Sequence, residues 1–135
     1  MKVTISTTVN ASIEKAWDFY TNPEHIVKWN FASDDWQCPS ASNDLRAGGK
    51  YAVRMEAKDG SFGFDLEAIY DEVEIGKMLK YTMSDNRTVV TTFEQNGEEV
   101  IITTVFDPED QNPVDMQQAG WQAILDNYAR KLMEE

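Results

Sequence analysis

The sequence predicts an α+β domain in which a curved, mostly antiparallel sheet of six strands wraps around a long C-terminal helix, with two short helices after the first strand. Segments of alternating apolar and polar residues, joined by turns rich in Gly, Asp and Asn, fill the middle of the chain and indicate hairpin-linked strands. Apolar residues then recur every three or four positions near the C-terminus, as in an amphipathic helix. With 135 residues, we expect residues 1–135 to form a single domain.

The chain begins with one strand and two short helices. Residues 3–9 alternate between apolar and hydroxylated side chains, the pattern of a half-buried strand. A serine can cap a helix over 13–20. Asn22 followed by Pro23 places a good cap before a residue suited to the first helical turn, which predicts a second helix over 23–29.

Residues 30–47 mix Ser, Asp, Asn and Pro with two large aromatic residues, Phe31 and Trp36. We interpret this segment as a long irregular connection, and loops of that length are often functional. Beyond it, five strands follow one another as a meander. The expected inward rows are Tyr51, Val53 and Met55; Phe62, Phe64, Leu66, Ala68 and Tyr70; Leu79, Tyr81 and Met83; and Val89, Thr91 and Phe93. The last strand, 100–106, is apolar or hydroxylated on both faces, so its inward register stays open.

A long helix is predicted over 113–133, with Asn112 as its cap and Pro113 in its first turn. Its broad apolar face needs a partner, and the concave face of the sheet is the surface within reach. That face consists of Gln117, Trp121, Ile124, Leu125, Tyr128 and Leu132.

The charge balance excludes several classes of partner. The chain carries 24 acidic and 12 basic residues, a net charge of −12. Nucleic acid and anionic membranes are bound largely through Lys and Arg, so we expect neither. No apolar run is long enough for a bilayer span, and the N-terminus lacks the apolar region of a signal peptide. We therefore expect a cytoplasmic protein, a monomer or a weak dimer, and its single cysteine agrees with a reducing compartment.

Few residues could support covalent or metal chemistry. His25 is the only imidazole, and the only thiol, Cys38, lies thirteen positions away. We interpret His25 as an exposed helix residue and Cys38 as a small loop residue. One Cys and one His cannot build a zinc site, and we expect no metal and no cofactor. Asp34 lies in the 30–47 connection, where its carboxylate could orient a ligand hydroxyl or amine.

The order of elements resembles the helix-grip fold of the START-like superfamily, also called SRPBCC, which includes the birch-pollen-allergen group. Within it, five motifs resemble the branch named after the C-terminal domain of the Hsp90 ATPase activator. These are Asn22-Pro23-Glu24 with Trp29; Asp44-Leu45-Arg46-x-Gly48-Gly49-Lys50-Tyr51; Tyr70-x-Glu72-Val73; Tyr81-Thr82; and Gln118-x-Gly120-Trp121-x-x-x-Leu125.

The resemblance implies a cavity between the sheet and the last helix that binds hydrophobic small molecules. Gly120 supports this expectation. A glycine inside a helix costs about 1 kcal/mol relative to alanine, so either a close approach of the sheet or a ligand to the helix, or added pocket volume, should compensate. Gln117 and Thr91 would be the polar groups that orient a ligand. The candidate ligand-binding residues are Trp29 and Trp36 at the entrance; Met55, Phe64, Leu66, Tyr81, Met83, Val89, Thr91 and Phe93 from the sheet; and Gln117, Gly120, Trp121 and Ile124 from the helix.

These observations favour non-catalytic binding of a small hydrophobic or aromatic molecule, such as a lipid, a polyketide or a flavonoid. Two alternatives remain. A cyclase-like or hydrolase-like enzyme could use the same pocket, with Tyr81, Gln117 or Asp34 as its acid or base. A chaperone-interaction module could instead use the acidic surface. The chaperone activator joins this kind of domain to a separate N-terminal one, so its role does not transfer directly.

Overall fold

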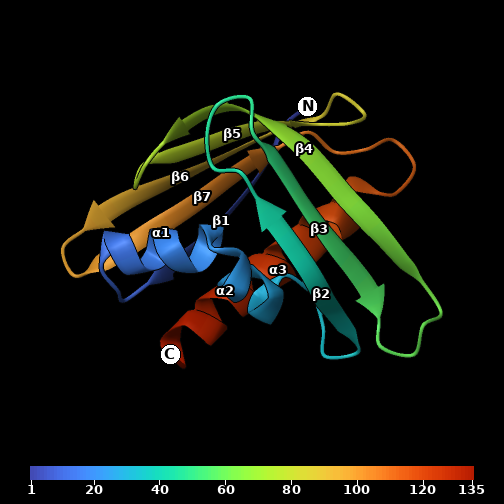
Figure 1. The fold of residues 1–135 in the computed structure, drawn as a ribbon, viewed down its shortest axis with the longest axis horizontal. Coiled ribbons are helices and arrows are strands. Elements are labelled where there is room, and N and C mark those ends of the chain that lie inside the picture. Colours follow the sequence, from blue (N-terminus) through green and yellow to red (C-terminus); the bar gives the residue numbers. More distant parts are fainter.

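The computed structural model describes residues 1–135 and has one antiparallel sheet of seven strands, in the order β1-β7-β6-β5-β4-β3-β2. The sheet is strongly curved, and the C-terminal helix runs across its concave face, while the two short helices lie near one end of that helix (Figure 1). This is the predicted α+β helix-grip architecture. The elements are β1 (Val3–Val9), α1 (Ile13–Thr21), α2 (Pro23–Trp29), β2 (Trp36–Asn43), β3 (Lys50–Ala57), β4 (Gly63–Glu74), β5 (Met78–Met83), β6 (Thr88–Asn96), β7 (Glu99–Phe106) and α3 (Val114–Met133).

The seventh strand is the main departure from the prediction. β2 lies inside the segment that we expected to be irregular, and it pairs with β3 at one edge of the sheet. Its register shifts between Gln37 and Ser40, where a bulge accommodates Pro39. Proline and serine hide the alternation by which a strand is recognised, and an edge strand tolerates them because one side needs no partner.

The inward rows of the other strands follow the predicted alternation, apart from Phe62, which lies in the β3–β4 turn and is exposed. β3 buries Val53 and Met55, and β6 buries its three expected residues. The structure also resolves the register of β7, since alternate residues from Val100 to Phe106 point into the core. Facing side chains from β1 and β7 therefore fill one end of the concave face.

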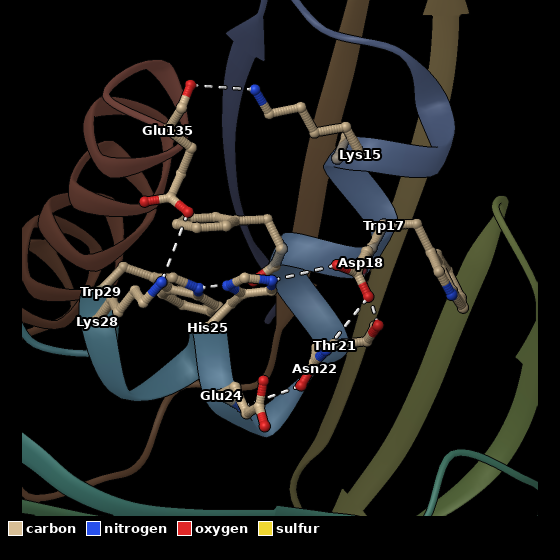
Figure 2. A network of polar contacts seen from close by, with 12 residues as sticks. Lys15, Trp17, Asp18, Thr21, Asn22, Glu24, His25, Lys28, Trp29 and Glu135 are labelled. Atoms are coloured by element: carbon tan, nitrogen blue, oxygen red, sulfur yellow. Dashed lines mark hydrogen bonds and ion pairs between the residues drawn. The ribbon is translucent and has the colours of Figure 1, made fainter.

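The two short helices form as predicted, each capped by the expected residue. The Ser12 side chain accepts a hydrogen bond from the Lys15 amide at the start of α1, and the Asn22 side chain accepts one from the Glu24 amide at the start of α2 (Figure 2). The indole of Trp29 donates to the Phe19 carbonyl at 2.8 Å. This contact ties the end of α2 to α1.

His25 is only partly exposed, contrary to our expectation of an exposed helix residue. Its Nε2 lies 3.2 Å from an Asp18 carboxylate oxygen, and its ring packs against Phe19 at 5.0 Å between centroids (Figure 2). Its Nδ1 is buried without a partner. The helix α2 carries His25 back toward α1, which sequence periodicity over so short a helix did not reveal.

The start of α3 also differs from the prediction. Asn112 does not cap it: the N-cap position is Pro113, and no side chain makes a capping hydrogen bond. The side chain of Gln117 instead holds the preceding loop. It accepts from the Glu109 amide at 2.8 Å and donates to the carbonyls of Glu109 at 3.0 Å and Asn112 at 2.8 Å. A side chain one turn into the helix therefore organises its entry.

The C-terminal half of α3 is the part that seals the core. Tyr128 and Leu132 are fully buried, and the Tyr128 hydroxyl donates to the Ala16 carbonyl of α1 at 2.7 Å. Along its other side, α3 reaches the free edge of β1, where the amides of Gln118 and Gln122 donate to strand carbonyls at 3.3 and 2.9 Å. None of the helices is long and apolar enough to cross a membrane.

Candidate functional site

A cavity of about 320 Å³ lies between the N-terminal half of α3 and the strands at the far side of the concave face. Thirteen of its eighteen lining residues are hydrophobic. They come from the sheet and its β5–β6 turn, from α1, from the end of α2 and the segment after it, and from α3. The lining residues are Ile5, Tyr20, Trp29, Asn30, Ala32, Tyr51, Met55, Phe64, Leu66, Tyr81, Met83, Arg87, Thr104, Gln117, Gly120, Trp121, Ile124 and Leu125.

Two features of α3 leave this space open. A Cβ placed on Gly120 would meet no heavy atom within 4 Å, so this glycine contributes volume and no backbone approaches it closely. One residue later, Trp121 stacks on Phe106 of β7, with 4.0 Å between ring centroids and 8° between planes. Its indole is therefore held against the β7 side of the cavity and does not fill the middle.

The structure brings most of the predicted site residues together around this cavity. Ten of the fourteen line it, and four do not. The ten are Trp29, Met55, Phe64, Leu66, Tyr81, Met83, Gln117, Gly120, Trp121 and Ile124; the four are Trp36, Val89, Thr91 and Phe93.

Two of the three β6 residues among those four, Thr91 and Phe93, contact α1. Phe93 packs edge-on against Trp17 at 5.1 Å and against Tyr20 at 5.4 Å. Val89 is 1% exposed and belongs to the same core. Thr91 is equally buried and forms a 2.9 Å hydrogen bond with Thr104, which does line the cavity. The strand periodicity places these residues on the correct face, but it does not say which helix covers them.

Trp36 lies one layer outside the cavity. Its ring contacts Phe62 at 5.9 Å and Phe64 at 6.1 Å, and of these Phe64 lines the cavity. Phe62 and Phe64 are 62% and 41% exposed. The three rings form an aromatic cluster at the turn end of the β3–β4 hairpin.

Sequence reasoning missed eight lining residues. Some carried a usable signal: Tyr51 shares the inward parity of Met55, and Tyr20 lies on the predicted apolar face of the first helix. Arg87 stands two positions before the inward Val89, but it was not among the residues that we expected to face inward. Leu125 belongs to the predicted apolar face of the last helix. Whether it reaches the cavity depends on how the helices dock, which no local pattern encodes. The same holds for Ile5, Asn30, Ala32 and Thr104.

The polar groups expected to orient a ligand are already engaged by the protein. Gln117 uses both ends of its amide on the loop before α3. The Thr91 hydroxyl lies 2.9 Å from that of Thr104 and 3.5 Å from that of Tyr20. These residues therefore fix the walls of the cavity.

Tyr51 and Tyr81 behave differently from the other tyrosines. Their rings lie 5.5 Å apart, and neither hydroxyl has a hydrogen-bond partner within the protein. Burial holds the pKa of both hydroxyls well above the ordinary tyrosine value, and a smaller effect of Arg87 lowers the pKa of Tyr81. Both side chains are therefore neutral hydrogen-bond donors at physiological pH.

The lining offers little for acid–base or nucleophilic chemistry. No carboxylate, imidazole or thiol is part of it. Asp34 is exposed on the loop after α2 and lies outside the lining. Cys38 is a buried residue of β2, where burial raises the pKa of its thiol to about 11. His25 pairs with Asp18, so no imidazole activates the thiol.

Comparison with known proteins agrees with this arrangement of sheet and helices. Residues 10–132 match the family described as activator of Hsp90 ATPase homolog 1-like protein. The chain belongs to this family. The match starts directly after β1 and runs to the last turn of α3, so it includes every lining residue except Ile5 of β1.

Two solved structures of moderate sequence identity share the fold. The solution structure of an activator of Hsp90 ATPase homolog 1-like protein from Aeromonas hydrophila is 36% identical, with a TM-score of 0.93 over 99% of this chain and 93% of that one. A protein from Cytophaga hutchinsonii is 44% identical, with a TM-score of 0.85 over 98% and 92%. At 19% identity, a Chromobacterium violaceum protein shares the fold alone, with a TM-score of 0.86 over 97% and 96%. A search of curated proteins finds no match.

Proposed function

We propose that the protein binds a small, largely apolar or aromatic molecule without chemical change, in the cavity between α3 and the sheet. The cavity itself carries the proposal. Its volume of about 320 Å³ lies within the range of small-molecule sites, roughly 300–1,000 Å³. Its predominantly hydrophobic wall matches the usual composition of such sites.

The lining also supplies a driving force and some adaptability. Apolar surface removed from water contributes about 25 cal/mol per Å², so a guest that covers this wall gains affinity without specific contacts. Met55 and Met83 face the cavity from two strands, β3 and β5. Unbranched thioethers adjust to guests of different shape. We therefore expect tolerance among ligands with similar apolar bodies.

The chemistry of the lining supports binding over catalysis. An acid or base catalyst works best with a pKa near the operating pH. Tyr81 has a pKa well above its ordinary value, and Gln117 does not titrate. Asp34, the third candidate, lies outside the lining. These properties leave the cavity with groups that bind and none suited to proton transfer.

A binding panel with a matched pair of variants tests the proposal. Aromatic polyketides, flavonoids and fatty acids are titrated while tryptophan fluorescence is followed, since Trp29 and Trp121 line the cavity. We expect saturable changes with some members of the panel. Gly120→Leu places a side chain in the open space and should abolish them, whereas Ala119→Leu, on the exposed side of the same helix, should not. A flat response to every compound would overturn the proposal.

A further inference from the structure

Three donor side chains of the cavity wall come from β3, β5 and the β5–β6 turn. Tyr81 of β5 pairs in register with Val89 of β6, and Arg87 precedes Val89 by two positions, which directs both side chains to the concave face. Tyr51 joins them from β3, with its ring 5.5 Å from that of Tyr81. All three residues line the cavity. We call Tyr51, Tyr81 and Arg87 the donor cluster.

The two tyrosine hydroxyls of the donor cluster stand out because the other tyrosines are paired. Tyr20 lies within hydrogen-bond distance of Thr91, Tyr70 donates to Asn43 at 2.7 Å, and Tyr128 donates to a backbone carbonyl. The one side-chain polar atom that is sealed from solvent and unpaired is His25 Nδ1. The hydroxyls of Tyr51 and Tyr81 therefore face accessible space in the cavity that their rings line.

Accessible hydroxyls without a partner in the protein are free to bind a ligand. Polar groups in protein interiors almost always have a hydrogen-bond partner, and a buried polar group without a hydrogen bond costs free energy. Burial keeps both tyrosines protonated, as described above. Their phenolic protons can therefore be donated to an acceptor that enters the cavity.

Arg87 adds a positive charge to the donor cluster. It is the one charged residue in the lining, although the chain as a whole carries a net charge of −12. Its Nε forms an ion pair with the Asp85 carboxylate at 2.7 Å, which offsets part of its charge and is the single hydrogen bond of its guanidinium. A guanidinium has five N–H donors in a planar fork that matches a carboxylate. Four of these donors stay free for a guest.

We propose that the donor cluster selects apolar molecules that carry a carboxylate at one end, with the carboxylate on Arg87 and Tyr81 and the apolar body against the α3 side of the cavity. This inference rests on the proposed function and specifies its ligand class. No carboxylate of the protein lines the cavity to repel such a group. The α3 side, with Trp121 and Ile124, offers no charge and accepts the apolar part.

Three naphthalene probes that differ in one substituent test the inference by calorimetric titration. They are 2-naphthoate, with a charged acceptor; 2-acetylnaphthalene, with a neutral acceptor; and 2-methylnaphthalene, with none. We expect affinity to fall in that order, by roughly two- to tenfold at each step, as the hydrogen bonds weaken. Arg87→Gln should remove the advantage of the acid over the ketone. Tyr81→Phe should weaken both but leave the hydrocarbon unchanged.

Tyr70→Phe is the matched control. It deletes a tyrosine hydroxyl that is bound to Asn43 and lies outside the lining, so it should leave all three affinities unchanged. Tyr81→Phe breaks no hydrogen bond within the protein, and a thermal melt should show it folded. If the three probes bind equally in the wild type and the variants, the donor cluster has no selective role, while the proposed function stands. If none binds, the proposed function fails and this inference fails with it.

Discussion

Gly120 shows how one absent side chain affects both stability and the cavity. A glycine inside a helix destabilises it by about 1 kcal/mol relative to alanine. In this protein no neighbouring atom requires glycine, because a Cβ at position 120 meets only open space. Glycine at this position therefore enlarges the cavity and lowers the stability of the helix.

We predict that Gly120→Ala raises the free energy of unfolding by up to about 1 kcal/mol, because it restores helix propensity without a clash. Urea denaturation of the variant and the wild type measures the change. The same methyl should weaken ligand binding slightly, since it occupies the cavity wall. A variant that is less stable than the wild type would contradict the open space at this position.

Cys38 is predicted to be an unreactive thiol in the folded protein. Burial raises its pKa to about 11, and only the thiolate reacts with alkylating agents. At pH 8 we expect iodoacetamide to modify it roughly 100-fold more slowly than a free cysteine, and the rate to rise as the pH approaches 11. Mass spectrometry of the time course measures this, with the urea-unfolded chain as the reactive control.

At the scale of elements, side chains join segments that are far apart in the chain. The carboxylate of Asp107, just after β7, lies 2.6 Å from the Lys2 ammonium and accepts from both the amide and the hydroxyl of Thr88 at 2.9 Å. These contacts, led by the Lys2 hydrogen bond, lower the pKa of Asp107 to about 2. They fasten the ends of β1, β6 and β7 together.

The lowered pKa implies a defined pH dependence. A carboxyl group with a folded pKa below its unfolded value stabilises the protein above about pH 4, and the contribution disappears as the pH falls through about 2. Asp107→Asn should therefore lower stability at pH 7 by about 0.2–1 kcal/mol, as is typical of exposed pairs. A carbon-13 NMR titration of the Asp107 carboxyl should show its midpoint near pH 2, and a midpoint near 4 would contradict the contacts.

The entry to α3 gives a second prediction at this scale. Gln117→Ala removes three hydrogen bonds to the loop from Glu109 to Asn112, so we expect a loss of about 1–3 kcal/mol and faster hydrogen exchange at the Glu109 amide. Gln118→Ala is the control, because that side chain makes one long contact, 3.3 Å to the Thr4 carbonyl. Equal effects of the two substitutions would argue against a special role for Gln117.

The elements that the sequence predicted correctly are those with strong local signals. The serine and asparagine caps located α1 and α2, and alternation located the meander strands. β2 was not predicted because Pro39 and its serine neighbours interrupt the alternation, and because its pairing with β3 is not encoded in the local sequence. The cap of α3 was wrong because Asn112 resembles Asn22 in sequence, while the loop before α3 is held by Gln117 instead.

For the molecule as a whole, the cavity depends on how α3 crosses the sheet. Helical spacing correctly indicated that Gln117, Gly120, Trp121 and Ile124 share one face, and all four line the cavity. On the polar side, Tyr51 and Tyr81 belong to predicted inward rows, but the position of Arg87 follows from sheet curvature and register, which local patterns do not determine. The lining could therefore be predicted only in part.

A ligand that fills the cavity should stabilise the entire fold. Because it binds the folded state, we expect the free energy of unfolding to rise by about 2.7 kcal/mol when its free concentration is 100 times Kd. The melting temperature should rise with ligand concentration in the wild type. Gly120→Leu should show no such rise, and a shift of equal size in that variant would place the ligand outside the cavity.

Neither edge strand of the sheet is suited to pairing with a strand of another chain. The bulge around Pro39 distorts β2, while Gln118 and Gln122 occupy outward carbonyls of β1. Unprotected edge strands can form backbone hydrogen bonds with other chains, which leads to fibrils and domain-swapped dimers. A second copy of this protein would have to dock through its side chains, so strand exchange is a poor route to its self-association.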